Sequence, residues 1–260
     1  MRPRSFDEFI GQEHIVGPGR VLRKGIEADQ LPSIVLWGPP GSGKTTLALL
    51  VNHLTQSHFE PITAVASGVS DLRRIIKEAK LRIGMHSQRT ILFIDEIHRF
   101  NKAQQDVILP HVEDGTVVLI GATTENPSFE VVAPLLSRSR VFTLKLLSEE
   151  QIEEIIRAAM KDAERGLGNL APQLDVDAMR TLVTLSNGDA RIALNALELA
   201  TNGTSPDGSS IRQVTATTVE DAMQQRALLY DKAGDQHYDT ISAFIKSVRA
   251  SDPNSAVYWL

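Results

Sequence analysis

Short apolar runs alternate with longer amphipathic segments through about the first 145 residues of the chain. The run at Thr90–Ile94 is apolar after its first residue, which is typical of a strand buried on both faces of a sheet. Further strands are predicted at Ile34–Trp37, Glu60–Ala66, Thr116–Ala122 and Val141–Leu144, with helices from about Lys44 and from about Ser70. Strands that alternate with helices form βαβ units, so the pattern predicts an α/β domain with a mostly parallel sheet.

The pattern becomes helical after about Ser148. Ser148 and Gln151, three residues later, form a capping-box pattern at the start of an amphipathic segment. This part shows no clear strand pattern, and its other predicted elements are helices at Asp175–Leu185 and Asp189–Ala200 and a surface loop at 202–210. We therefore expect a small all-helical domain here.

The pattern as a whole predicts three domains. They are an α/β domain over 1–145, the helical domain over 146–225, and the beginning of a further helical domain over 226–260. The last of these ends on Val-Tyr-Trp-Leu. Because a domain rarely ends on such an exposed apolar cluster, we expect the third domain to be truncated.

The composition excludes several classes of site. The chain of 260 residues has no cysteine, which excludes disulfides, thiolate zinc sites and cysteine nucleophiles and fits a cytosolic protein. No apolar run approaches the length of a membrane span, and the N-terminal segment lacks the apolar core of a secretory signal. The net charge is −5, so any contact with nucleic acid must come from a local basic patch.

A glycine-rich loop follows the first predicted strand and precedes a predicted helix. Its residues, Gly38–Thr45, match the phosphate-loop pattern G-x-x-x-x-G-K-[ST] in full. Glycines let backbone N–H groups curl around phosphate oxygens, and the helix N-terminus attracts anions. Lys44 adds charge at the β- and γ-phosphates, and the Thr45 hydroxyl is a ligand for Mg²⁺. We expect ATP and Mg²⁺ to be bound by Gly38, Pro39, Pro40, Gly41, Ser42, Gly43, Lys44, Thr45 and Thr46.

Two adjacent carboxylates end the buried strand. Asp95 can hold Mg²⁺ directly or through water, and Glu96 can orient and polarise an attacking water as a base. An apolar run that ends in Asp-Glu is often only a strand that meets solvent. After a complete phosphate loop, it predicts hydrolysis of ATP.

The strand predicted at Thr116–Ala122 is followed by further polar residues. A polar side chain here would lie beside the γ-phosphate and the water, and we expect Thr124 in this role, with Asn126 as the alternative. Thr and Asn are also common in strand-end turns, so a purely structural role stays open. Arg138 and Arg191 lie further along the chain, and arginine neutralises charge well in phosphoryl transfer. Either one alone could be an ordinary surface charge.

The order of these motifs resembles an AAA+ ATPase of the clamp-loader branch. The stretches Ile91–Asp106 (ILFIDEIHRFNKAQQD), Gly121–Phe129 (GATTENPSF) and Tyr230–Pro253 resemble, more closely, the replication-associated recombination protein A family. The eukaryotic counterpart of that family is the Werner-helicase-interacting protein. The resemblance runs from about Arg2 to Leu260. It implies a P-loop core, a helical lid and a helical oligomerisation domain.

The resemblance also implies roles for individual residues. Arg138 would be an arginine finger that reaches the site of a neighbouring subunit, and Arg191 would be a sensor in the lid of its own subunit. Thr63 would hold Glu96 inactive until DNA binds. The adenine-side pocket would lie within Ile10–Gly17 and include Ile10, Val16 and Gly17.

The function that the resemblance implies is a DNA-dependent ATPase at stalled or damaged replication forks. Its partners would be single-stranded or forked DNA, further copies of the chain joined through the C-terminal domain, and replication proteins such as single-strand-binding protein. It would lie in the cytoplasm with the nucleoid in a bacterium and in the nucleus in a eukaryote, without contact with a membrane. Two alternatives stay open: a motor that migrates Holliday junctions, and a nucleotide-gated scaffold that recruits replication proteins.

One basic helix is the candidate DNA contact. Basic side chains recur in the segment Asp71–Arg82 at helical spacing, at Arg73, Arg74, Lys77 and Lys80. Phosphate contacts from such a face would be independent of sequence and sensitive to salt. A solvated helix face would give the same pattern. His98 and Arg99, just after Glu96, could couple DNA to the active site or only cap a loop.

Overall fold

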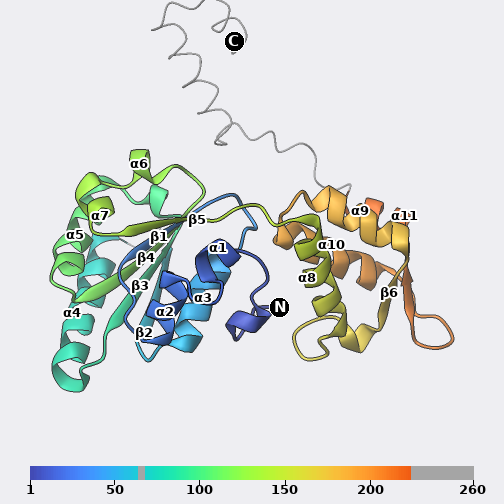
Figure 1. The fold of residues 1–260 in the computed structure, drawn as a ribbon, viewed down its shortest axis with the longest axis horizontal. Coiled ribbons are helices and arrows are strands. Elements are labelled where there is room, and N and C mark those ends of the chain that lie inside the picture. The colour runs from blue at the N-terminus through green and yellow to red at the C-terminus, as the bar shows by residue number, and fades with distance from the viewer. Residues whose placement is uncertain (64–67, 224–260) are drawn as a thin grey trace, which may run out of the picture. The chain divides into compact units, whose positions relative to one another are not determined.

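The computed structural model describes residues 1–63 and 68–223 of the chain (Figure 1). Within these residues lies a sheet of five parallel strands in the order β2-β3-β4-β1-β5. The strands are β1 (Ile34–Trp37), β2 (His58–Thr63), β3 (Thr90–Asp95), β4 (Val117–Thr123) and β5 (Arg140–Thr143). The predicted α/β class with a parallel sheet is confirmed.

Helices cover both faces of this sheet (Figure 1). Along β3, Ile91 and Phe93 belong to one apolar cluster, and Leu92 and Ile94 belong to another, because side chains alternate across a strand. The first cluster includes residues of α1 (Glu13–Val16), α2 (Val21–Glu27) and α3 (Lys44–Leu54). The second includes residues of α4 (Val69–His86), α5 (Lys102–Glu113) and α7 (Ala133–Ser137). Shorter elements complete this part, namely η1 (Phe6–Glu8), η2 (Ile97–Arg99) and α6 (Pro127–Glu130).

A helical part with its own apolar cluster follows the sheet. Its helices are α8 (Glu149–Lys161), η3 (Gly168–Leu170), α9 (Val176–Ser186), α10 (Ala190–Gly203) and α11 (Ala216–Met223). The structure adds a feature to the predicted all-helical domain: the three-residue strands β6 (Pro172–Leu174) and β7 (Arg212–Val214) form a parallel pair. Strands of this length are too short to show alternation in the sequence.

The local signals for the helices are realised as hydrogen bonds. The Ser148 hydroxyl accepts from Gln151 N, and the Gln151 side chain accepts from Ser148 N, so the predicted capping box begins α8. The side chains of Asp175 and Asp189 cap α9 and α10 by accepting from backbone N–H groups, without the reciprocal bond of a capping box. None of the described helices is long and apolar enough to cross a membrane.

The described residues do not test every prediction. The part of the second predicted strand at Ala64–Ala66 and the predicted domain at 226–260 lie outside the described residues. The division into three domains also stays a prediction, although the described residues form separate apolar clusters before and after about residue 146.

Candidate nucleotide-binding and hydrolysis site

The phosphate loop joins the end of β1 to the start of α3. Three of its glycines, Gly38, Gly41 and Gly43, have positive φ angles of 157°, 69° and 98°. A side chain at Gly38 would collide with the backbone of Leu144, and one at Gly41 would collide with Asp189. Only glycine fits these positions, so this loop conformation requires glycine at each of them.

Lys44 lies in the first turn of α3 and its side chain turns back into the loop. Its Nζ donates to Gly38 O at 2.6 Å and to Pro39 O at 2.8 Å. Burial lowers the pKa of Lys44 to about 8, against the opposing charges of Glu96 and Asp95. A desolvated ammonium whose partners are two carbonyl oxygens is suited to receive phosphate oxygens in their place.

The two predicted Mg²⁺ ligands lie in contact. Thr45 Oγ1 donates to Asp95 Oδ2 at 3.0 Å, which links the start of α3 to the end of β3. A hydroxyl and a carboxylate are the oxygen ligands that Mg²⁺ prefers. No group of three or more metal-ligating His, Asp or Glu side chains occurs in the described part of the chain, so the nucleotide and water would complete the coordination.

Glu96 follows Asp95 with a positive φ of 56° and precedes the turn η2. Its carboxylate lies 3.2 Å from His98 Nε2 and 3.7 Å from Arg99 Nε. Thr63, opposite Asp95 at the end of β2, is exposed and makes no hydrogen bond with Glu96 among the described residues. The proposed restraint of Glu96 by Thr63 therefore stays a prediction, while contact with His98 is present.

Thr124 comes directly after β4. Its side chain is partly exposed, and its hydroxyl has no hydrogen-bond partner among the described residues, which leaves it available for a ligand. Asn126 Oδ1 accepts from Ser128 N at 3.0 Å and caps α6, so its oxygen already has a partner. This difference favours Thr124 over Asn126. The neighbouring Thr123 is fully buried and contacts His98, a link that no motif in the sequence indicates.

The two candidate arginines differ in their surroundings. Arg191 lies in the first turn of α10, and its charge lowers the pKa of Lys44, so the helical part brings Arg191 towards the phosphate loop. Arg138 directly follows α7, and its Nε lies 2.7 Å from Glu113 Oε1 at the end of α5. The contacts of Arg138 lie outside the phosphate loop and the strand ends. This position is compatible with a role of Arg138 in the nucleotide site of another subunit.

Gln12 lies within the predicted adenine-side range Ile10–Gly17, but the sequence analysis gave it no role of its own. Its side chain is buried, and its Nε2 donates to Ser42 O at 3.2 Å and to Lys145 O at 2.7 Å. Its Oε1 accepts from Lys145 N at 3.0 Å. One amide thus joins the N-terminal segment, the phosphate loop and the connection after β5. A lone Gln carries no motif, so only the tertiary structure reveals it.

The predicted adenine-side residues lie beside Gln12. Ile10 is partly buried, Gly17 is buried, and Val16 packs into the apolar cluster of the sheet. The Phe9 ring lies against Gly43, since a Cβ there would be 3.3 Å from the ring. The structure therefore brings the N-terminal segment against the phosphate loop, while contact of these residues with a nucleotide stays a prediction.

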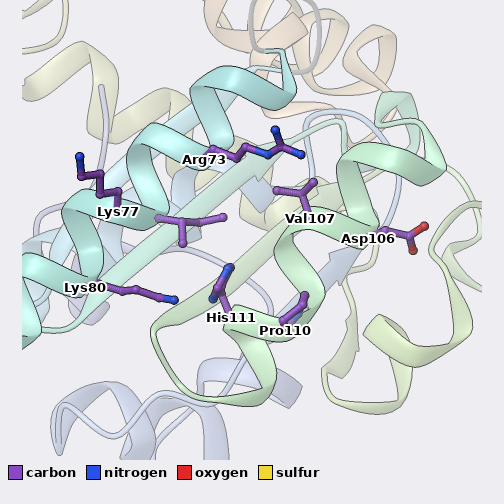
Figure 2. Close-up of a pocket in the computed structure, with 8 residues that line it drawn as sticks. Arg73, Lys77, Lys80, Asp106, Val107, Pro110 and His111 are labelled. Carbon is purple, nitrogen blue, oxygen red and sulfur yellow. The ribbon is translucent and has the colours of Figure 1, made fainter.

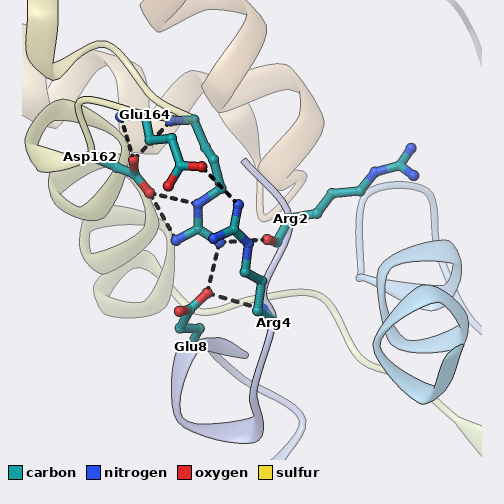
Figure 3. A network of polar contacts seen from close by, with 6 residues as sticks. Arg2, Arg4, Glu8, Asp162 and Glu164 are labelled. Atoms are coloured by element: carbon teal, nitrogen blue, oxygen red, sulfur yellow. Dashed lines mark hydrogen bonds and ion pairs between the residues drawn. The ribbon is translucent and has the colours of Figure 1, made fainter. Parts of the chain in front are cut away.

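The N-terminal segment also contacts the helical part (Figure 3). Arg165 pairs with Glu8 at 3.0 Å and with Asp162 at 2.9 Å, and Arg4 pairs with Glu164 at 3.1 Å. The Arg165 guanidinium lowers the pKa of Glu8. The Arg4–Glu164 pair is exposed and contributes little stability, whereas the side chains of Arg165 and Asp162 are only 26% and 18% exposed.

The predicted DNA residues separate onto two faces of α4. Arg73, Lys77 and Lys80 line an open groove of about 450 Å³ between α4 and α5, opposite Asp106 and His111 (Figure 2). Arg74 is not among the residues that line this groove, and it forms an ion pair with Glu78 at 2.9 Å. The structure thus brings three of the four predicted cations together.

Comparison with known proteins agrees with this fold and site. The model of the P-loop domain of the Holliday junction DNA helicase RuvB matches residues 1–137, and the model of an AAA C-terminal domain matches 168–249. A solved structure of the Thermotoga maritima RuvB Holliday junction branch migration motor is 26% identical, with a TM-score of 0.68 over 95% of this chain and 80% of that one.

Curated relatives match the whole length of the chain. Replication-associated recombination protein A of Escherichia coli K12 is 47% identical over 100% of this chain and 58% of that protein. ATPase WRNIP1 of Dictyostelium discoideum is 40% identical over 100% of this chain and 31% of that protein. The chain therefore spans less than two thirds of the length of these relatives.

The fold and the site define an AAA+ ATPase, with a phosphate loop, an Asp-Glu strand and a helical lid. The chain belongs to the replication-associated recombination protein A family.

Proposed function

We propose that this chain hydrolyses ATP between subunits and that DNA at stalled or damaged replication forks stimulates the reaction. The observation that carries the proposal is the meeting of Thr45, Asp95 and Lys44 at one edge of the sheet. Parallel strands bring their carboxyl ends to the same edge, where α/β proteins bind ligands. The names of the relatives support a role in replication and recombination.

In the proposed mechanism, ATP lies along the phosphate loop. Backbone N–H groups and Lys44 contact its phosphates, and Thr45 and Asp95 would hold Mg²⁺. A bound Mg²⁺ supplies countercharge for the phosphate oxygens. Glu96 accepts the proton of the attacking water, and Thr124 donates a hydrogen bond at the γ-phosphate. The cation of Arg191 stabilises negative charge from the lid.

Oligomerisation completes the proposed site. Arg138 has its contacts away from the phosphate loop of its own chain. In the proposed oligomer it approaches the γ-phosphate bound by the next subunit and stabilises charge in the transition state. The predicted oligomerisation domain at 226–260 lies outside the described part of the chain.

The groove between α4 and α5 is the proposed contact with DNA. Arg73, Lys77 and Lys80 lie at positions i, i+4 and i+7, which fall on one face of a helix. Three cations on one face suit a row of backbone phosphates, and the single acid opposite them, Asp106, does not cancel their charge.

Turnover of ATP with and without DNA tests the proposal most directly. We expect single-stranded and forked DNA to raise the rate several-fold at constant protein concentration, because the bound DNA aligns neighbouring subunits. If no DNA changes the rate and ATP still binds, the nucleotide-gated scaffold is the better explanation.

A second candidate is a motor that migrates Holliday junctions, and the structural similarity to RuvB favours it. Four-way junctions and forks distinguish the two. Preferential stimulation by a four-way junction, with movement of its branch point, would support the motor. Preferential stimulation by forks with single-stranded gaps would support action at stalled forks.

A further inference from the structure

His98 is the more deeply placed of the two basic side chains that reach Glu96. The side chain of His98 is 10% exposed, against 57% for Arg99. Its Nε2 lies 3.2 Å from Glu96 Oε2, whereas Arg99 Nε lies 3.7 Å from the same oxygen. An exposed contact at that distance contributes little. His98 is therefore the side chain that can fix the position of the Glu96 carboxylate.

The backbone brings this pair together. Glu96 adopts the left-handed conformation, with φ of 56°, and the turn η2 starts at the next residue. Few side chains other than Asn and Asp adopt that conformation without strain. Ile97 is fully buried and anchors the turn. The chain therefore turns sharply after Glu96 and brings His98 back beside it.

The other ring nitrogen of His98 contacts the neighbouring strand. His98 Nδ1 lies 3.0 Å from Thr123 Oγ1, at the end of β4. That hydroxyl donates its one hydrogen to Glu125 O and accepts from Glu125 N. An imidazole that donates to the Glu96 carboxylate carries an N–H on Nε2, so Nδ1 either accepts the Thr123 hydrogen in place of Glu125 O or, in the doubly protonated ring, donates to the Thr123 oxygen.

The Glu96 carboxylate also lies within electrostatic range of Lys44. Among the charged groups, the Glu96 carboxylate makes the largest contribution that raises the pKa of Lys44. Glu96 therefore lies near the phosphate loop while it contacts His98. Thr123 directly precedes Thr124, the candidate contact of the γ-phosphate, so the ring of His98 connects the two catalytic strand ends.

We propose that His98 is a positioning residue that links the base Glu96 to β4 through Thr123. The proposal rests on the function proposed above, because it needs Glu96 to act as the base. His98 fixes Glu96 where an attacking water must bind.

Two conservative variants separate the two contacts of the ring. In His98→Asn the amide N–H lies close to the position of Nδ1 and can still reach Thr123, but the shorter side chain has no donor that reaches Glu96. In His98→Gln the amide N–H lies close to the position of Nε2 and can still reach Glu96. We expect His98→Asn to lower kcat on the order of tenfold or more, since general-base catalysis depends on positioning. We expect His98→Gln to keep more of kcat than His98→Asn.

The nucleotide affinity distinguishes positioning from a structural defect. Both His98 variants should have a Kd for ATP and a KM within about twofold of the wild type, because neither contact of the His98 ring involves the phosphate loop. Thr123→Val should lower kcat, and Thr123→Ser, which keeps the hydroxyl, should restore it. Arg157→Gln is the control, since it removes an exposed ion pair with Glu153 away from the site, and it should leave kcat within about twofold.

The outcomes separate this proposal from the function on which it rests. If Glu96→Gln abolishes hydrolysis while His98→Asn keeps the wild-type kcat, the positioning role is wrong and the proposed function stands. Equal kcat in Thr123→Val and wild type would also overturn it. A fall in ATP affinity as large as the fall in kcat would assign His98 a structural role instead. If Glu96→Gln hydrolyses ATP normally, the proposed function fails first.

Discussion

Arg138 Nε lies 2.7 Å from Glu113 Oε1, and Arg138 Nη1 donates to Pro134 O and Ser137 Oγ at 3.2 Å each. The guanidinium is thus oriented by its own chain. About half of each side chain is exposed, and such pairs contribute roughly 0–1 kcal/mol. In the proposed oligomer, a phosphate of the ATP bound by the next subunit therefore replaces Glu113 at little cost.

We expect Arg138→Ala to bind ATP normally and to lower hydrolysis on the order of 10³-fold, as for other fingers supplied by a neighbour. Mixing it with Lys44→Ala provides the sharper test. The first variant has a complete phosphate loop and no finger; the second has the finger and no functional loop. Mixed oligomers should regain some turnover. Full activity of Arg138→Ala alone would contradict a shared site, as would an inactive mixture that still assembles.

Glu96→Gln should separate binding from hydrolysis. The amide cannot accept the proton of the water, so turnover should fall roughly 10²–10⁴-fold while ATP affinity stays near that of the wild type. Titration with labelled ATP and a phosphate-release assay measure the two quantities. Lys44→Ala is the contrasting variant, because it should lose binding itself. Hydrolysis by Glu96→Gln at the wild-type rate would show that another group is the base.

The affinity for ATP should fall as the pH rises above about 8. The pKa of Lys44 in the free protein is lowered to about 8, so the ammonium is present below that pH and is lost above it. ATP binds the protonated form, and its negative charge raises the pKa of Lys44 in the complex. Affinity should therefore be constant below pH 8 and decline by up to about tenfold per pH unit above it. Calorimetric titration from pH 7 to pH 9.5 measures this, and a constant Kd would contradict it.

The two faces of α4 should behave differently in DNA binding. Replacing Arg73 and Lys77 with Ala should weaken binding to all sequences alike and reduce the slope of its salt dependence by about 2. Basal turnover without DNA should change little. Arg74→Ala is the matched control on the same helix, because Arg74 pairs with Glu78 and does not line the groove. Equal losses in both variants would mean that the groove is not the contact.

Gln12→Ala should destabilise the protein and weaken ATP binding. The side chain is 3% exposed and makes three hydrogen bonds, to Ser42 O, Lys145 O and Lys145 N. Its removal leaves buried backbone groups without partners, at a cost of about 1–3 kcal/mol. Urea unfolding measures this. Gln88→Ala, which removes one exposed bond to Gln56 O, should cost less than about 0.5 kcal/mol.

The sequence alone determined the α/β class, the phosphate loop and the Asp-Glu pair. These features depend on local rules: glycine is required where φ is positive, as at Gly41, and an apolar run is required where a strand such as β3 is buried on both faces. The capping box at Ser148 is equally local, because its two hydrogen bonds join residues three positions apart. Such rules can be evaluated without knowledge of the rest of the fold.

Only the tertiary structure decided which residues meet across the chain. Two hydrogen bonds join Gln12 to Lys145 and one joins His98 to Thr123, in both cases between distant segments, and nothing local in the sequence marks these contacts. The same is true of the division of α4, where Arg73 faces the groove and Arg74 pairs with Glu78. Helical spacing predicts a basic face, but its orientation depends on the apolar contacts of Leu72, Ile75 and Ala79 with the sheet and its neighbouring helices. Packing is a property of the whole chain, and it therefore sets the contacts that local rules leave open.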